Sequence, residues 1–201
     1  MSIGPDFKEV LEEIGTSVLV IRDEGVLSGE YMIPKPNRQV TKPFIQEFFL
    51  EGRLAYDTEI EGGDVVQLIS SPDVFLVMNK NGRDFEGECF EQDVVMYKAN
   101  VSGEICRAVE VEVDYDTKQS FPPIRTNSYA LITESMFGNE MLDTEQGRFQ
   151  VNKKDLYVPH KYGMQVGDRY CPVSGENYMV DSVMTRRFEN VDMVTLVDDT
   201  R

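Results

Sequence analysis

The sequence predicts a mainly β protein with two tandem small β-barrel or β-sandwich modules and a short N-terminal helix. Short runs of β-branched and aromatic residues alternate with turn residues, which is typical of barrels and sandwiches. The length of 201 residues is enough for two small domains. The second half of the chain also repeats several patterns of the first half in the same order.

Apolar residues at helical spacing predict one helix at the start of the chain. Its apolar positions are Phe7, Val10, Leu11 and Ile14. Pro5 and Asp6 precede them, and Gly15 is a suitable C-terminal stop. Two interpretations stay open: a helix packed on the fold, or a docking peptide for a partner.

Six short runs are the clearest strand candidates. They span residues 17–22, 29–33, 65–69, 74–78, 92–98 and 110–116. The segment 34–43 contains three prolines, which lack a backbone donor and favour extended geometry in the residue before them. We therefore expect an extended Pro-rich arm at 34–43 and no central strand.

We place the module boundary after Asp116. Residues 1–116 then hold the helix, the first β module and the arm, and residues 117–201 hold a linker and the second β module. Chance similarity of two β-rich halves is the alternative to a repeat. The matched pairs are Gly63-Asp64-Val65-Val66 with Gly167-Asp168-Arg169-Tyr170, Phe75-Leu76-Val77 with Tyr178-Met179-Val180, Phe85-Glu86 with Phe188-Glu189, Leu54-Ala55-Tyr56 with Lys154-Asp155-Leu156-Tyr157, and residues 17–21 with 128–132.

The two Gly-Asp pairs lack the Lys-Ser/Thr and the following helix of a phosphate-binding loop. We expect the glycine to adopt a positive φ and the aspartate to cap a turn before a strand.

The charge excludes several functions. Lys and Arg number 20 against 36 Asp and Glu, so the net charge is −16 and the pI is about 4.4. Such a surface repels phosphate, which argues against a grip on nucleic acid or an anionic membrane. No apolar run approaches the roughly 20 residues of a membrane span, and the first residues lack a secretory signal pattern. We expect a folded protein of the cytoplasm.

Residues for chemistry are sparse. We expect no catalytic, cofactor-binding or metal-binding residues, and no cofactor. His160 is the only histidine, and Cys89, Cys106 and Cys171 are too widely spaced for a zinc site or a disulfide framework. An enzyme would need a pocket that unites two carboxylates with shifted pKa values. The candidates are Asp57, Glu59, Asp64, Glu86 and Glu88.

Two charged segments are the candidate interaction sites. Acidic and apolar residues alternate strictly through 110–116, which places every acid of one strand on one face. These acids are Glu110, Glu112, Asp114 and Asp116. The arm at 34–43 carries Lys35, Arg38 and Lys42, an unusual density of cations for this chain. The acidic face either keeps the protein soluble or lies next to an anionic molecule that must not bind to it.

The whole pattern resembles a known group of proteins. A helix, short strands, a Gly-Asp turn, an aromatic-x-Val strand and Phe-Glu before a last apolar strand are similar to the β-barrel neck proteins of tailed bacteriophages. These are the head–tail stopper, adaptor and head-completion proteins. The resemblance is closest in residues 167–170, 178–183 and 194–196 and covers about half of the chain. Such stoppers are often single modules, whereas this chain holds two.

The resemblance implies a non-enzymatic virion structural protein, assembled in the host cytoplasm into a homo-oligomeric ring at the head–tail junction. Portal or adaptor and tail proteins would be its partners, and viral DNA would pass through the lumen without specific binding. Glu110, Glu112, Asp114 and Asp116 would face the lumen, and Lys35, Arg38 and Lys42 would form an inter-subunit arm. A tail terminator, another tail or capsid-associated protein, an interaction module and a carboxylate-based enzyme are the alternatives.

Overall fold

The structure is a computed structural model that describes residues 3–35, 48–113, 116–134, 153–173 and 175–199. The chain divides into two compact units. The first comprises Met1–Ala99 with Phe188–Val191, and the second comprises Asn100–Arg187 with Asp192–Arg201.

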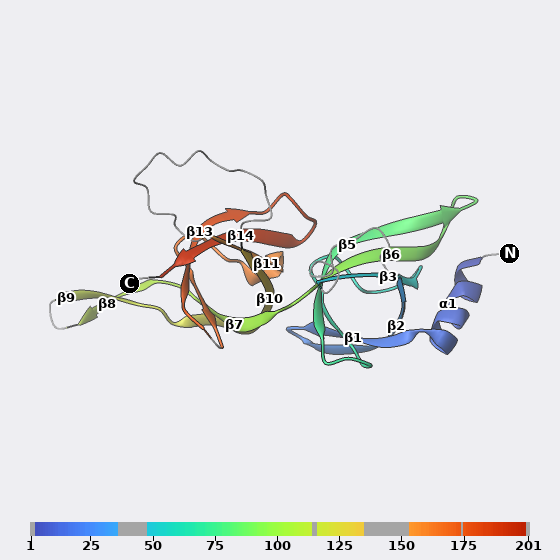
Figure 1. Cartoon of the computed structure of the whole chain (residues 1–201), viewed down its shortest axis with the longest axis horizontal. Helices are drawn as coiled ribbons and strands as arrows, with labels where there is room; N and C mark the ends of the chain where they lie inside the picture. The colour runs from blue at the N-terminus through green and yellow to red at the C-terminus, as the bar shows by residue number, and fades with distance from the viewer. Residues whose placement is uncertain (1–2, 36–47, 114–115, 135–152, 174, 200–201) are drawn as a thin grey trace. The chain divides into compact units, whose positions relative to one another are not determined.

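The first unit is a closed barrel with a helix at its N-terminal end (Figure 1). The strands follow the order β1-β2-β3-β6-β5-β4, and β4 pairs back onto β1. A closed barrel leaves no strand with an unpaired edge. Its elements are α1 (Ile3–Ile14), β1 (Thr16–Arg22), β2 (Gly25–Lys35), β3 (Phe49–Ala55), β4 (Val65–Leu68), β5 (Val74–Phe85) and β6 (Glu88–Lys98).

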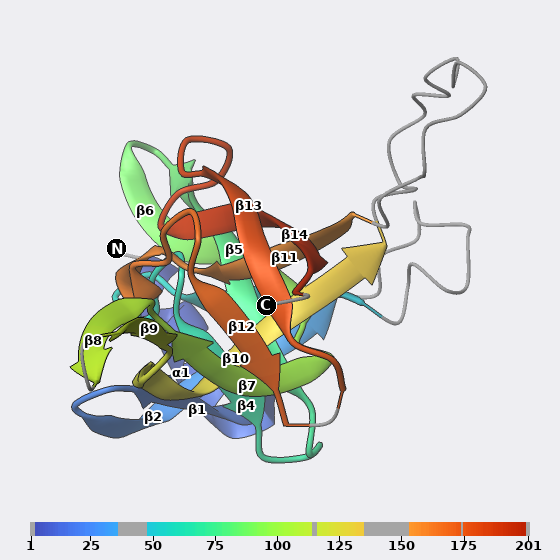
Figure 2. The same cartoon turned by 90° about the vertical axis from the view of Figure 1, so that its left-hand side faces the viewer.

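The second unit is another closed barrel, whose strands are labelled in Figure 2. Its order is β7-β10-β11-β14-β13-β12, and β12 pairs back onto β7. A separate two-stranded sheet, β8-β9, lies between β7 and β10 in the sequence. The elements are β7 (Val101–Cys106), β8 (Val109–Val113), β9 (Asp116–Ser120), β10 (Pro123–Glu134), β11 (Lys154–Pro159), the 3-10 helix η2 (His160–Tyr162), β12 (Arg169–Pro172), β13 (Tyr178–Met184) and β14 (Val191–Asp198).

Both barrels have the same topology. When the barrel strands of each unit are numbered from its first, both follow the order 1-2-3-6-5-4. The mainly β fold class with two tandem small modules and a short N-terminal helix is therefore confirmed.

The topology corrects one match of the sequence repeat. The counterpart of β1 is β7, whereas residues 128–132 lie in β10, the counterpart of β2. Equivalent pairings agree with this: Val20 pairs with Val66 in the first barrel, and Ile105 pairs with Tyr170 in the second. Residues 17–21 and 128–132 look alike because both are buried β runs, and local pattern does not reveal which neighbour a strand pairs with.

The division between the units also differs from the sequence-based boundary. The structural division falls between Ala99 and Asn100. A boundary at 116/117 would assign β7 to the first barrel, although it is a strand of the second. It would also separate β8 from most of its partner strand β9. The connection between the barrels is short and lacks a Pro-rich signal. The Pro122-Pro123 pair instead precedes and begins β10.

Each barrel encloses its own apolar core. In β1, the buried residues Val18 and Val20 alternate with the less buried Leu19 and Ile21, as the period of two requires. The first core includes Val18, Val20, Met32, Leu54, Ile60, Val66, Val77, Val94 and Met96. The second includes Ile105, Ala130, Leu156, Val158, Tyr170, Val180, Val194 and Leu196.

Helix α1 begins earlier than the sequence predicted. It starts at Ile3, so Pro5 lies in its first turn, where a backbone donor has no helical acceptor and proline is tolerated. Leu11 is fully buried, and Gly4 packs so closely on the Tyr56 ring that a Cβ there would lie 2.9 Å from it. The helix therefore packs on the first barrel, through only part of its apolar surface.

Strand β2 continues into the predicted arm. Its pairing with β1 ends at Met32, while Pro34 pairs with Gly52 and Lys35 with Glu51 of β3. Pro34 thus has a strand neighbour on one side only, so its missing donor breaks no ladder. Residues 36–43 of the expected arm lie outside the described residues.

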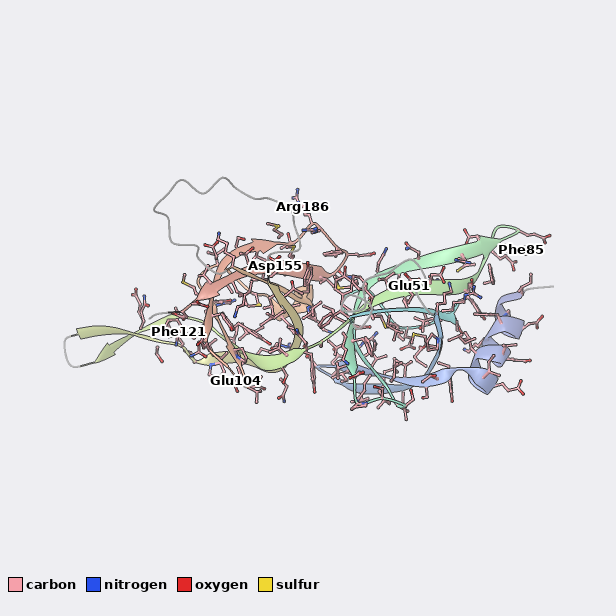
Figure 3. The ribbon with its side chains drawn as sticks, viewed as in Figure 1. Glu51, Phe85, Glu104, Phe121, Asp155 and Arg186 are labelled. Atoms are coloured by element: carbon pink, nitrogen blue, oxygen red, sulfur yellow. The ribbon has the colours of Figure 1, made fainter. Side chains whose placement is uncertain are left out.

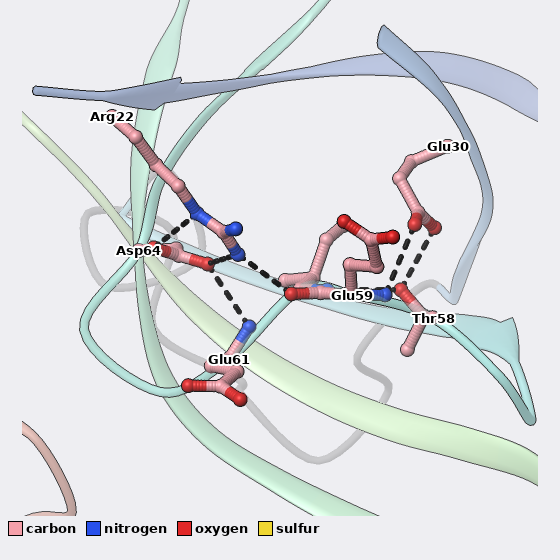
Figure 4. Close-up of polar contacts among 7 residues, drawn as sticks. Arg22, Glu30, Thr58, Glu59, Glu61 and Asp64 are labelled. Carbon is pink, nitrogen blue, oxygen red and sulfur yellow. Dashed lines mark hydrogen bonds and ion pairs between the residues drawn. The ribbon is translucent and has the colours of Figure 1, made fainter. Parts of the chain in front are cut away.

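An arginine–aspartate pair fixes the turn before β4 in the first barrel (Figure 4). Arg22, at the end of β1, donates from Nε and Nη2 to the two carboxylate oxygens of Asp64, at 3.3 and 2.7 Å. Its Nη2 also donates to the Glu59 carbonyl at 2.6 Å. The Asp64 carboxylate in turn accepts the Glu61 backbone N–H at 3.1 Å. The side chain of Asp64 is only 8% exposed.

The second barrel repeats this arrangement residue for residue. Arg107, directly after β7, donates from Nε and Nη2 to Asp168 at 2.9 and 2.8 Å. Its Nη2 also donates to the Gly163 carbonyl, and Asp168 accepts the Gln165 backbone N–H, both at 2.8 Å. In both barrels the carbonyl lies five residues before the aspartate and the N–H lies three residues before it. We call each arrangement an Arg–Asp lock.

The predicted role of the Gly-Asp pairs is confirmed. Gly63 and Gly167 have φ values of +83° and +89°, a region that glycine enters without steric cost. Each following aspartate caps the turn through the backbone N–H three residues earlier. The arginine partners were not anticipated.

Removal of an arginine from a lock will destabilise its barrel. Arg22→Ala or Arg107→Ala leaves a buried carboxylate without its cation, which costs about 3–5 kcal/mol in a fully buried pair. Because each arginine is about one third exposed, we expect a loss of roughly 2–4 kcal/mol in the free energy of unfolding. Urea unfolding followed by far-ultraviolet circular dichroism measures it.

The matched control is Lys8→Ala. Lys8 pairs with Asp57 at 2.7 Å, but both side chains are well exposed, so this variant should unfold at the wild-type urea concentration. Equal unfolding midpoints for Arg22→Ala, Arg107→Ala and the wild type would contradict the assigned role of the locks.

Candidate functional site

The acidic run 110–116 is divided between two strands. The register pairs Glu110 with Gln119, Glu112 with Thr117, and Val113 with Asp116. Glu110 and Glu112 therefore belong to β8, whereas Asp116 begins the returning strand β9. Asp114 lies outside the described residues. The sequence pattern could not show this division, because acidic and apolar residues alternate without interruption up to Asp116.

The acidic hairpin, defined as β8 and β9, is an insertion specific to the second barrel. In the first barrel, β1 and β2 are joined by Asp23 and Glu24 alone, whereas the equivalent strands β7 and β10 are separated by the whole hairpin. The hairpin extends away from its barrel (Figure 1). Glu110 is exposed. That these acids face a lumen stays a prediction.

Of the three arm cations, only Lys35 is described, and Arg38 and Lys42 lie outside the described residues. Lys35 forms an ion pair with Asp93 of β6. Arg83 Nε also contacts Asp93 at 2.5 Å, and Arg83 and Arg53 lie 3.4 and 3.5 Å from the Glu91 carboxylate. Lys35 is thus engaged within its own barrel, and its role as an inter-subunit contact stays a prediction.

These five residues form a cationic cluster on the surface of the first barrel. The cluster comprises Lys35, Arg53, Arg83, Glu91 and Asp93, with three cations and two carboxylates. Glu91 is only 2% exposed, whereas Arg53 and Arg83 are 39% and 50% exposed, so the guanidinium groups present most of the outward charge of this cluster. The five side chains together carry one net positive charge, which suits contact with an acidic surface.

Two aspartates have pKa values shifted in opposite directions. Burial raises the pKa of Asp93, but the bonds and charges of Lys35 and Arg83 outweigh it, so the net pKa lies below the ordinary value of 3.8. Burial raises the pKa of Asp155 in β11, and the charge of Arg187 offsets this only in part. Figure 3 labels Asp155 on the second barrel.

His160 is held by a buried carboxylate. Its Nδ1 lies 2.9 Å from Asp192 Oδ1, and Asp192 is 2% exposed while the imidazole is 58% exposed. If Nδ1 carries the ring proton, Nδ1 donates to Asp192 and Nε2 is the acceptor nitrogen of the ring. In the described ranges, no group of three or more His, Cys, Asp or Glu side chains is placed to hold a metal ion.

A small hollow of about 50 Å³ lies beside α1. Its lining residues are Lys8, Leu11, Glu12, Gly29, Glu30, Tyr31, Ala55 and Asp57. Of the five carboxylates proposed for an enzyme site, only Asp57 lines it, and Asp57 is paired with Lys8. Asp64 belongs to the first lock, and Glu86 and Glu88 flank the tip of the β5-β6 hairpin. The hollow therefore does not unite two of these five carboxylates.

Large apolar side chains are exposed where strands turn. They are Val26 at the β1-β2 turn, Ile69 after β4, Phe85 at the β5-β6 tip, Val173 after β12 and Met184 at the end of β13. Figure 3 labels Phe85 at the end of its hairpin, where Glu86 and Gly87 both have positive φ values, as a tight two-residue turn requires.

Helix α1 also leaves apolar residues exposed. Ile3, Val10 and Ile14 are spaced by seven and four residues, so they lie along one side of the helix. Ile14 is 67% exposed. Because these three side chains are neighbours on one side of the helix, they form a candidate contact surface for another protein, whereas single exposed apolar residues at strand ends are common on protein surfaces. The helical periodicity predicted Val10 and Ile14 as helix positions, but not Ile3, which precedes the predicted helix, and not that these side chains would remain exposed.

The comparisons with known proteins assign no family. No family model and no curated protein matches this chain. A search of solved structures finds similarity to MrkH of K. pneumonia, at 8% sequence identity, over 99% of this chain and 84% of that chain, with a TM-score of 0.20. A TM-score this low supports no conclusion about fold or function. Within the part of the chain that the structure describes, no helix is long and apolar enough to cross a membrane.

The two shifted aspartates should affect stability with opposite signs. Because its pKa is lowered on folding, Asp93 stabilises the fold above pH 3.8, and this contribution is lost as the pH falls through its folded pKa. Asp93→Asn should therefore lower the free energy of unfolding at pH 7 by about 1–2 kcal/mol, and the difference should shrink at pH 3. Urea unfolding at pH 7 and at pH 3 measures the difference in the free energy of unfolding between the variant and the wild type. These two pH values lie on either side of the pI of about 4.4.

Asp155→Asn should change the free energy of unfolding at pH 7 in the opposite direction. Its raised pKa means that the ionised carboxylate is disfavoured in the fold, so stability is lost as the pH rises through the folded pKa. The variant should be more stable than the wild type at pH 7 and equal to it at pH 3. A loss of stability at pH 7 would show that the Arg187 charge, and not burial, dominates at Asp155.

Proposed function

We propose that this chain is a non-enzymatic virion structural protein that assembles into a ring at the head–tail junction of a tailed bacteriophage. Its partners are further copies of itself, portal or adaptor proteins and tail proteins. Viral DNA passes through the lumen of the ring without specific binding. The observation that carries the proposal is the combination of two rigid closed barrels with exposed apolar residues at their turns. The resemblance in residues 167–170, 178–183 and 194–196 supplies the phage context.

Closed barrels favour contacts through side chains at their ends. Where a barrel is closed, no strand edge is free to pair with a strand of a neighbour, so association there relies on turns, hairpins and helices. Phe85, Val173 and α1 offer apolar groups for such contacts. In a ring, each contact joins two different surfaces of identical subunits, and the rotation between subunits closes the ring.

Charge both permits DNA passage and opposes assembly. A net charge of −16 gives a passing polyanion little to bind, because phosphate contacts need cations. The same charge makes subunits repel one another at long range. The cationic cluster around Arg53 and Arg83 is the described surface best suited to an acidic neighbour, such as the acidic hairpin of another copy. Salt screens the general repulsion within about 10 Å at 0.1 M.

Size-exclusion chromatography with light scattering, at micromolar concentration and at two salt concentrations, tests this proposal. We expect species at multiples of 22.9 kDa, with a larger assembled fraction at 300 mM than at 50 mM NaCl. Negative-stain images of the assembled fraction should show rings.

Variants of exposed apolar residues test where the contacts lie. Phe85→Ser, or Val10→Ser combined with Ile14→Ser, should weaken the association constant by about tenfold without changing the unfolding midpoint, since a lost apolar contact of roughly 1.5 kcal/mol has that effect. Glu9→Ser, on the polar side of α1, is the matched control. A strict monomer in all conditions, including with candidate neck proteins, would argue against the proposal.

A further inference from the structure

Two of the three cysteines meet across the strand pair that closes the second barrel. Cys106 ends β7 and Cys171 lies in β12, and their Sγ atoms are 3.7 Å apart. The register pairs Cys106 with Arg169 and Cys171 with Glu104, so the cysteines are diagonal neighbours on antiparallel strands. Both are free thiols, separated by 65 residues in the sequence.

The two strands lie close together beside the thiols. A Cβ on Gly103 would lie only 2.5 Å from the Cys171 carbonyl oxygen. A disulfide needs an S–S distance of about 2.05 Å, and the present separation exceeds this by roughly 1.7 Å. Because the cysteines are diagonal and not directly opposite, closing this gap requires rotation of both side chains together with a small local shift of β7 against β12.

We infer that Cys106 and Cys171 are a modification site, at which a low-molecular-weight disulfide converts the two thiols to an intramolecular disulfide. A thiolate attacks one sulfur of the small disulfide, forms a mixed disulfide and releases one small thiolate. The second cysteine then attacks the protein sulfur and releases the other small thiolate. The protein loses two electrons and two protons, and the small disulfide becomes two thiols.

Cys171 is the entry point for this reaction. Its side chain is partly exposed, whereas Cys106 is 5% exposed. Burial and the contact with Cys106 raise the pKa of Cys171 to about 11, Glu104 adds to this, and the nearby Arg169 acts in the opposite direction. The thiolate is therefore scarce at neutral pH, which keeps the pair reduced until an oxidising disulfide is abundant.

The first barrel has no equivalent pair. By the shared topology, Cys106 corresponds to Ile21 and Cys171 to Gln67, which lie on the closing strands β1 and β4. The cross-link would therefore tie only the second barrel, at the strand pair beside its Arg–Asp lock. A disulfide that spans 65 residues constrains the unfolded chain strongly, so the barrel gains stability when the bond forms.

The test treats the full chain with oxidised glutathione at pH 8.5, then blocks free thiols with N-ethylmaleimide and measures the intact mass. We expect a single maleimide adduct, on Cys89, and a protein mass about 2 Da lower before the adduct is counted. Non-reducing peptide mapping should join the peptides of Cys106 and Cys171. The melting temperature of the second barrel should rise by on the order of 10 °C, and dithiothreitol should reverse the rise.

Cys89→Ser is the matched control, because Cys89 lies in the first barrel and contacts Gln92. This variant should form the same disulfide and carry no adduct. Cys171→Ser should carry two adducts and show no thermal shift. Three maleimide adducts on the treated wild type, a linkage that includes Cys89, or disulfide-bonded dimers would each overturn the inference, and none of these readouts depends on a destabilised variant.

Discussion

The bidentate contact between an arginine and a buried aspartate is the interaction on which both barrels depend. In each barrel the arginine lies at the end of the first strand or directly after it, and the aspartate directly precedes the strand that pairs back onto the first, so the contact lies where the sheet closes. A buried carboxylate needs a cation and hydrogen-bond donors to offset its lost hydration. The guanidinium and the backbone N–H three residues earlier supply both, and the turn is held in one conformation.

The two barrels are alike in these contacts and differ in what they add to the surface. The lock geometry, the positive φ of the preceding glycine and the strand order are common to both. The first barrel adds a helix and a long β5-β6 hairpin, and the second adds the acidic hairpin and a pair of adjacent thiols. The shared residues maintain the barrel, so the differing residues are where each unit has acquired its own role.

Local chemistry made part of this structure predictable. The turn at Gly63 and Asp64 could be predicted from the sequence, because a turn of this kind needs a glycine with positive φ and a capping aspartate that are adjacent in the chain. Arg22 could not be recognised as the partner, because 42 residues separate it from Asp64 and any surface strand can end with a cation. For the same reason β7 was assigned to the first module, and Asp116 was placed on the same strand as Glu110. The sequence predicts that Lys35 contacts a neighbouring subunit. Its contact with Asp93 could not be predicted, because it depends on the register of β2, β3 and β6.

The acidic hairpin shows how such a barrel can change without being rebuilt. Because it joins β7 to β10 at one end of the sheet, its length is not set by the register of the six barrel strands. In the first barrel, only two residues connect the equivalent strands. A lineage can therefore lengthen, shorten or replace this loop without disturbing the core, and new specificity at this position carries little risk to folding.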